Sequence, residues 1–281
     1  MGTGAVFRRR GEMMRPLGSE DGLFDQGICT AEPCRQRGTA MRLAIVSDIH
    51  GNWEALKQVR SDWSRRNIER IVSLGDNVGY GPDPDLVLRF LDRNGIPSIL
   101  GNHELGLIEP KILDWFNRVA RVSLELTRER LNATDLDHLR RLPTTLSDQG
   151  ARFVHGCPPD SITTYLFQPS AAVLTRIIQE LPERICFVGH THTLELVELA
   201  AGGLRRAALA ADTYRIDRRS RWVINVGSVG QPRDGDNRAK YVIWDTQAET
   251  IQVRRVAYDI AATVEKIRRR GWPESNAQRL W

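Results

Sequence analysis

The feature of this sequence that most constrains its fold is a set of short apolar runs, each ending at polar side chains beside a glycine. The first run, residues 43–46, reads LAIV and is followed by Asp48, His50 and Gly51. A continuous apolar run of this length is typical of a strand buried on both faces of a sheet. Side chains two positions apart in an extended chain point to the same side. Asp48 and His50 are therefore predicted to face in one direction.

The same arrangement recurs four more times along the chain. Residues 70–74, 97–100, 152–154 and 185–188 run into Gly75-Asp76-Asn77, Gly101-Asn102-His103-Glu104, His155-Gly156 and Gly189-His190-Thr191-His192. Of the six histidines five lie in these turns, and only His138 does not. Ligands of open α/β sheets bind beyond the carboxyl ends of the strands. The sequence therefore predicts that five strand ends form one shared site.

The order of the predicted elements indicates the fold class. Strands and helices alternate between residues 42 and 100, with the first helix at 53–65, which favours parallel strands joined by right-handed crossovers. Residues 105–142 are predicted to be helical, and the apolar stripe at helical spacing is typical of core packing. The stripe consists of Ile112, Trp115, Phe116, Val119, Val122 and Leu126.

The second half of the chain is richer in strands. Residues 144–154 are predicted to form a hairpin, and residues 170–180 a helix. Beyond His192, strands are predicted at 194–199, 222–226, 241–245 and 250–256, followed by a basic helix at 259–270. This order predicts an α/β protein with two packed sheets flanked by helices.

Composition limits the alternatives. Hydrophobic content of 41% and charged content of 27% are typical of a soluble globular protein, and no apolar run approaches the roughly 18 residues of a membrane span. A formal net charge of +5 suits anionic substrates without arguing for nucleic acid as a stable partner. The four cysteines form no Cys-x-x-Cys pair, so neither a zinc knuckle nor a redox motif is indicated, and a reducing cytoplasmic location is expected.

The expected domain organisation has three parts. Residues 1–40 lack periodicity and are expected to be a disordered N-terminal extension. Residues 41–272 are expected to form a single domain, and residues 273–281 a C-terminal tail. Because Met41 directly precedes the first strand, we hypothesise that it is the functional start.

Taken in order, the strand-end blocks resemble the calcineurin-like metallophosphoesterases, in particular the bacterial and archaeal phosphatase-like members. That family has Asp-x-His, Gly-Asp, Gly-Asn-His-(Asp/Glu), His-Gly and Gly-His-x-His, and every block is present here between Asp48 and His192. A single block could be a polar turn or a helix cap. Together and in order, the blocks are specific.

The resemblance implies a four-layer αββα sandwich of two mixed sheets flanked by helices. It also implies two metal sites that share one carboxylate. The ligands carried over are Asp48, His50 and His192 for one metal, Asn102, His155 and His190 for the other, and Asp76 as the bridge. Oxygen and imidazole donors without thiolate suit divalent manganese, iron, zinc, cobalt or nickel, and manganese is expected first.

The activity that the resemblance implies is hydrolysis of a phosphomonoester or phosphodiester by a metal-bridging hydroxide. His103 corresponds to the general acid of the family, and imidazole has a reference pKa near 6.5. Glu104 stands where many relatives have Asp, and we expect its longer carboxylate still to orient His103.

Substrate contacts are expected from two further segments. The loop 77–84 follows directly on Asp76, so Asn77 and Tyr80 are predicted at the rim of the site, although Tyr80 could instead pack on neighbouring prolines. Residues 225–234 are similar to a further family block. Arg233 could pair with a phosphate, or alternatively with Asp234 or a surface acid.

Other function classes stay open. The same fold could be a catalytically silent scaffold for protein docking, which would predict eroded ligands; the sequence keeps them. A nucleic-acid binder is weakly indicated by basic pairs such as Arg218-Arg219, which lack interleaved aromatic residues. The expected substrate is a small phosphoester or a phosphoprotein. The sequence predicts neither its identity nor the oligomeric state of the protein.

Overall fold

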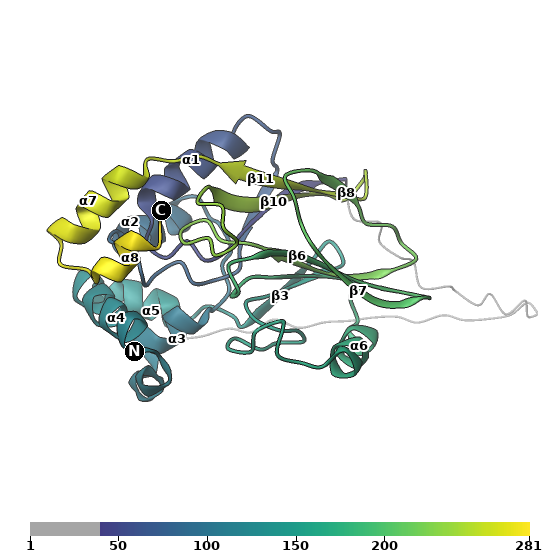
Figure 1. Cartoon of the computed structure of the whole chain (residues 1–281), viewed down its shortest axis with the longest axis horizontal. Helices are drawn as coiled ribbons and strands as arrows, with labels where there is room; N and C mark the ends of the chain where they lie inside the picture. The colour runs from purple at the N-terminus through teal and green to yellow at the C-terminus, as the bar shows by residue number, and fades with distance from the viewer. Residues whose placement is uncertain (1–39) are drawn as a thin grey trace, which may run out of the picture. The chain divides into compact units, whose positions relative to one another are not determined.

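Two mixed β-sheets organise residues 40–281, the part of the chain that the computed structural model describes (Figure 1). The first sheet has the strand order β2-β1-β10-β11-β8, in which only β1 and β2 are parallel neighbours. Its strands are β1 (Arg42–Val46), β2 (Arg70–Ser73), β8 (Thr213–Arg215), β10 (Ala239–Asp245) and β11 (Thr250–Val256).

The second sheet has the strand order β3-β4-β5-β9-β6-β7, and β4, β5 and β9 are parallel to one another. Its strands are β3 (Thr145–Asp148), β4 (Ala151–Val154), β5 (Ile185–Val188), β6 (Leu194–Ala200), β7 (Gly203–Ala208) and β9 (Arg221–Val226). Each sheet therefore combines parallel and antiparallel pairs.

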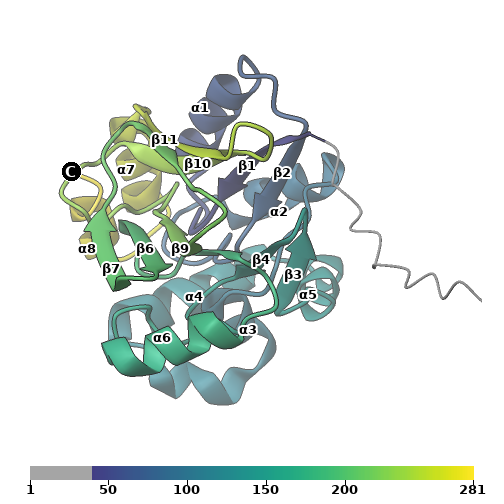
Figure 2. The same ribbon diagram turned by 90° about the vertical axis from the view of Figure 1, so that its right-hand side faces the viewer.

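Helices cover the outer faces of the two sheets, with α1 on one side and α6 on the other (Figure 2). The helices are α1 (Trp53–Trp63), α2 (Pro84–Arg93), α3 (Asn102–Ile108), the 3₁₀ helix η1 (Pro110–Trp115), α4 (Arg118–Arg130), α5 (Ala133–Arg140), α6 (Ala171–Glu180), α7 (Ile260–Arg269) and α8 (Glu274–Gln278). None of the helices between residues 40 and 281 has both the length and the apolar character that crossing a membrane requires.

Strand β1 shows why its apolar run must be buried on both faces. Leu43 and Ile45 pack into the core between the two sheets, whereas Ala44 and Val46 pack against the core that includes α1. A third core lies between the second sheet and α6. The four-layer αββα arrangement of two mixed sheets flanked by helices is thus confirmed.

Three segments differ from the expectation. Residues 97–100 form only one parallel bridge to β2, at Ser98, because Pro97 has no N–H for a longer ladder. The region 105–142 is divided by Pro110 and by caps at Asn117 and Asn132 into α3, η1, α4 and α5. Residues 273–281 contain α8, and Leu280 joins a buried cluster with α7. Residues 1–40 were predicted to be disordered. Residues 1–39 lie outside the described part of the chain, so this stays a prediction.

Candidate metal centre

The carboxyl ends of four strands bring the predicted ligands together. Asp48 and His50 follow β1, Asp76 follows β2, His155 follows β4, and His190 and His192 follow β5, while Asn102 is the first residue of α3. Backbone hydrogen bonds fix the turns to one another, because His50 N donates to Asp76 O at 2.9 Å and Gly189 N donates to His155 O at 2.9 Å. His190 N donates to Asp48 Oδ2 at 3.0 Å, which joins the two sheets at the site.

A first group of donor atoms comes from Asp48, His50 and His192, all of them buried. His192 Nε2 lies 3.2 Å from Asp48 Oδ1 and 3.1 Å from His50 Nε2. His50 Nε2 lies 3.8 Å from Asp48 Oδ1. Three donors therefore converge on one small volume.

A second group comes from Asp76, His155 and His190, with Asn102 beside it. His155 Nε2 lies 3.3 Å from Asp76 Oδ2, 3.2 Å from His190 Nδ1 and 3.1 Å from Asn102 Oδ1. Asp76 Oδ2 also lies 3.8 Å from His50 Nε2, which belongs to the first group. Asp76 thus stands between the two groups.

The outer ring nitrogens of four histidines face backbone carbonyls, which can only accept a hydrogen bond. The pairs are His50 Nδ1 with Val78 O (2.9 Å), His155 Nδ1 with Leu74 O (2.8 Å), His192 Nδ1 with Gln231 O (2.5 Å) and His190 Nε2 with Thr163 O (3.1 Å). In a neutral imidazole, the nitrogen that donates carries the only N–H, so the inner nitrogen presents a lone pair. With the rings neutral, the carbonyls would hold the four inner nitrogens in an orientation that suits metal binding.

This tautomer leaves the first group without hydrogen atoms between its donors. His50 Nε2 and His192 Nε2 would present lone pairs to one another, and Asp48 Oδ1 has no hydrogen-bond partner within residues 40–281. Buried lone pairs at such distances repel one another unless a cation or a proton lies between them. The donor set fits a divalent cation.

The charges of the site displace the pKa values of its groups. Burial raises the pKa of Asp76, but the neighbouring His155 and His103 outweigh burial and hold it well below its usual value. Burial lowers the pKa of His155, yet the Asp76 carboxylate outweighs this and raises it to about 9. Burial and the charge of His155 lower the pKa of His190 to about 3. A metal that binds at His155 must displace this proton, so metal binding is expected to become stronger as the pH rises toward 9.

Five of the seven predicted ligands have left-handed backbone conformations. The φ angles are 53° for Asp48, 49° for His50, 51° for Asp76, 68° for His190 and 60° for His192. Asp and His adopt this region more readily than most residues, but it still costs energy. Such conformations tend to cluster at functional sites, where the surrounding hydrogen bonds hold them.

His103 is buried beside Asp76 in a cage of aromatic rings. Its ring centroid lies 4.6 Å from that of His50, 4.7 Å from that of Tyr80 and 5.3 Å from that of Phe116. Its Nε2 lies 4.0 Å from Asp76 Oδ2, and its backbone N donates to Asp76 Oδ1 at 2.8 Å. Burial lowers the pKa of His103 to about 4. The ring is therefore neutral at pH 7 unless negative charge is added nearby.

Glu104 does not orient the His103 side chain, contrary to the expectation. Its carboxylate accepts hydrogen bonds from the backbone N–H groups of Asn77 (2.6 Å), Asp76 (2.8 Å) and Gly101 (3.1 Å). The carboxylate braces the turn that carries Asp76 against the start of α3. Burial, together with the charge of Asp76, raises the pKa of Glu104 to about 7. No sequence signal distinguished this role, because the partners are backbone atoms.

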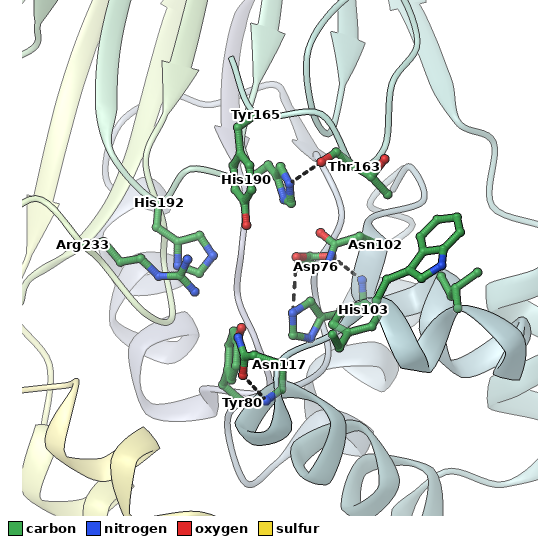
Figure 3. Close-up of a pocket in the computed structure, with 14 residues that line it drawn as sticks. Asp76, Tyr80, Asn102, His103, Asn117, Thr163, Tyr165, His190, His192 and Arg233 are labelled. Atoms are coloured by element: carbon green, nitrogen blue, oxygen red, sulfur yellow. Dashed lines mark hydrogen bonds and ion pairs between the residues drawn. The ribbon is translucent and has the colours of Figure 1, made fainter. Parts of the chain in front are cut away.

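A cavity of about 250 Å³ opens above the donor atoms. Figure 3 shows Asp76 and Asn102 at its centre, with Arg233 and His192 on one side and Tyr165 next to His190. The predicted site residues that line it are Asp76, Tyr80, Asn102, His103, His190, His192 and Arg233, while Asp48, His50 and His155 lie outside the lining. The lining residues that the sequence reasoning missed are Ile112, Trp115, Phe116, Asn117, Ala120, Thr163 and Tyr165.

The apolar stripe of residues 112–126 is consequently only in part a core stripe. Trp115 is 73% exposed and lines the cavity together with Ile112 and Phe116. The expectation of core packing was wrong for Ile112 and Trp115, because η1 ends at Trp115 and places them at the mouth of the site. Phe116 lines the cavity and also packs against the core cluster that contains Leu107 and Leu124. The apolar residue types at positions 112–126 could not show where the helix would be interrupted, or which of these side chains the interruption would expose.

The three predicted substrate contacts have different positions. Tyr80 lines the cavity. Asn77 is fully buried and outside the lining, and its Oδ1 accepts a hydrogen bond from Ser73 Oγ at 2.6 Å. Arg233 lines the cavity, with its guanidinium carbon 5.7 Å from the Tyr80 ring centroid. Asp234, the alternative partner of Arg233, lies 2.8 Å from Lys240 Nζ instead.

Comparison with known proteins gives a consistent assignment. Residues 41–249 match the calcineurin-like phosphoesterase superfamily domain. An uncharacterized protein of Methanocaldococcus jannaschii is 34% identical over 244 residues, which cover 85% of this chain and 97% of that protein.

Solved structures agree with this match. A metallophosphoesterase from Sphaerobacter thermophilus is 36% identical with a TM-score of 0.73, covering 86% of this chain and 98% of that one. A hypothetical protein from Pyrococcus horikoshii shares the fold with a TM-score of 0.70 at 19% identity, covering 85% and 97% of the two chains. The chain belongs to the calcineurin-like phosphoesterase superfamily.

Proposed function

We propose that this protein is a two-metal phosphoesterase that hydrolyses a phosphomonoester or a phosphodiester. The observation that supports this most is the position of Asp76, whose Oδ2 lies within 3.8 Å of His50 Nε2 and 3.3 Å of His155 Nε2. Two cations placed close together repel each other, so an anion between them is needed to hold both. The retained donor set argues against a catalytically silent scaffold.

The residues that would hold the cations form two sets around the shared carboxylate. Asp48, His50 and His192 would hold one, Asn102, His155 and His190 the other, and Asp76 both. Once bound, two divalent ions lower the pKa of a water molecule toward neutrality and stabilise the charge on phosphate oxygens. We propose manganese as the first ion to test, since the donors are oxygen and imidazole.

The remaining steps fall to side chains at the cavity. In hydrolysis the oxygen of a water molecule forms a bond to phosphorus, the ester P–O bond breaks, and the leaving alkoxide needs a proton. His103 is proposed to supply that proton. Its pKa is lowered to about 4 by burial, and the negative charge of a bound phosphate would raise it, which is the direction a general acid requires.

A metal-reconstituted screen tests the function directly. The chain is stripped with a chelator, reloaded with manganese, and assayed on p-nitrophenyl phosphate, its bis ester, a nucleotide and a phosphopeptide. We expect hydrolysis of at least one ester that appears with manganese and disappears with chelator. A chain that binds manganese but hydrolyses none of these esters would contradict the proposal and favour the scaffold.

Arg233 gives a prediction about substrate binding. Its guanidinium donates to Gln231 Oε1 at 2.9 Å and faces the cavity without a carboxylate within 4.0 Å among residues 40–281. Hydrogen bonds to charged groups contribute about 1.5–3 kcal/mol, so Arg233→Ala is expected to raise KM about tenfold or more. Steady-state kinetics would measure this, with the exposed Arg205→Ala on β7 as the control. An unchanged KM would exclude a phosphate contact.

A further inference from the structure

The mouth of the cavity carries an aromatic side chain that the proposed chemistry does not use. Trp115 is the last residue of η1, lines the cavity and is 73% exposed. Its neighbour Phe116 packs against the core cluster that contains Leu107 and Leu124, so the end of η1 is anchored. A large indole that is left exposed beside a pocket, on a segment that is anchored to the core, is typical of a ligand-binding surface.

A second aromatic surface reaches the same cavity from a different segment. Tyr165 lies on the loop after β4, and its ring stacks on His190 with centroids 4.0 Å apart and planes 12° apart. Phe167 stacks on Tyr165 at 5.0 Å and 10°, and is 63% exposed. Hydrogen bonds hold this loop, since Cys157 N donates to Thr164 O at 2.8 Å. Two of the four large hydrophobic side chains exposed among residues 40–281 therefore belong to the surroundings of this one cavity.

Polar groups line the same cavity as these aromatic side chains and the donor atoms. Arg233 supplies a cation, and Thr163 and Asn117 are exposed at the lining. Asn117 Oδ1 accepts from Ala120 N at 3.0 Å, which leaves its amide N–H₂ as a donor. The cavity volume of about 250 Å³ is slightly below the usual range of ligand pockets, about 300 to 1,000 Å³, so only a compact ligand would fit. A compact ligand that combines an anionic group, hydrogen-bonding groups and a flat apolar ring matches this set of lining groups.

We propose that the substrate is a nucleoside phosphate whose base stacks on Trp115 while its phosphate faces Arg233 and the donor atoms. This inference rests on the proposed function for the reacting end, but the base-binding surface is a separate property of the chain. Stacking of a base on an aromatic side chain is tolerant of base identity, because every base has a π-face. Trp115 is then the residue that determines specificity, without taking part in the reaction.

The experiment compares adenosine 5′-monophosphate with ribose 5-phosphate on the manganese-loaded protein. The two esters have the same leaving oxygen and differ at C1 of the ribose, which carries the base in one and a hydroxyl in the other, so a difference in kcat/KM reports base recognition. We expect the nucleotide to be preferred, and Trp115→Ala to lower its kcat/KM about tenfold while leaving that of ribose 5-phosphate unchanged. Trp281→Ala, which removes an exposed tryptophan outside the cavity lining, is the matched control.

Equilibrium binding of the same two compounds to the metal-free protein, measured by calorimetry, provides a readout that does not need turnover. Equal affinity of the parent protein for both compounds, or equal affinity of the parent and Trp115→Ala for the nucleotide, would overturn the inference. A phosphotyrosine peptide whose binding alone depends on Trp115 would overturn it as well. Hydrolysis of both esters at one rate would preserve the phosphoesterase and reject base recognition. Base-dependent binding without hydrolysis of any ester would preserve base recognition and reject the phosphoesterase.

Discussion

Asp76→Asn is expected to lower kcat/KM by about 10³-fold or more and to reduce the bound manganese from about two ions per chain to about one. Asp76 is ionised at any working pH, since its neighbours hold its pKa well below the usual value. The asparagine removes the negative charge between the two donor groups while keeping an oxygen that can accept the N–H of His103, an interaction of 2.8 Å in the parent. Elemental analysis and steady-state kinetics measure the two effects.

The control for this variant is Asp114→Asn, which neutralises a carboxylate that is 79% exposed and pairs with Arg121 at the surface. It is expected to keep both metal content and activity. The melting temperature of metal-free Asp76→Asn should stay close to that of the metal-free parent, which separates loss of metal from loss of fold. An Asp76→Asn protein that holds two manganese ions and turns over at the parent rate would refute the bridging role.

His103→Gln is expected to keep the metals and lose turnover in a manner that depends on the leaving group. General acid catalysis contributes about 10²–10⁴-fold when the leaving alkoxide needs a proton. An alkyl phosphate should therefore lose turnover by about that factor, whereas p-nitrophenyl phosphate, whose phenolate leaves without a proton, should lose far less. Rates on the two esters, measured together with metal content, test the role.

His138→Gln is the matched control, because His138 lies on α5 outside the cavity lining and is not among the grouped donor atoms. Equal losses on both esters would assign His103 to holding the site together, given its place between Tyr80 and Phe116. Unchanged turnover on the alkyl ester would remove His103 from the reaction.

The fold was predictable where local pattern and burial coincide. The run at residues 43–46 is buried on both faces because one side meets the second sheet and the other meets α1. The predicted helix at 170–180 forms as α6 with Ser170 as its cap. The long helical prediction failed at Pro110, which has no N–H to continue α3, and at Asn117, which caps the start of the separate helix α4. Helix propensity alone did not show that these interruptions would place Ile112, Trp115 and Phe116 at the cavity.

The site divides in the same way. The side chains of the blocks that follow strand ends lie close together, because the carboxyl ends of parallel strands in each sheet meet at one edge of that sheet. Glu104 could not be assigned from its type, since its partners are three backbone N–H groups brought together by the tertiary fold. The position of Trp115 at the cavity could not be predicted from its place in a helical apolar pattern, because the exposure of a side chain depends on which segments pack against it in the folded chain.

The left-handed φ angles at the predicted ligand residues have a consequence for the stability of the folded chain and therefore for its abundance in a cell. Cations that bind only the folded arrangement would favour folding by mass action, in proportion to the logarithm of their free concentration over Kd. When metal is scarce, this contribution would be lost while the cost of the strained turns would remain, so the folded chain would be less stable. Metal supply would thus govern abundance as well as catalysis, and starvation for the ion would leave less protein rather than merely idle protein.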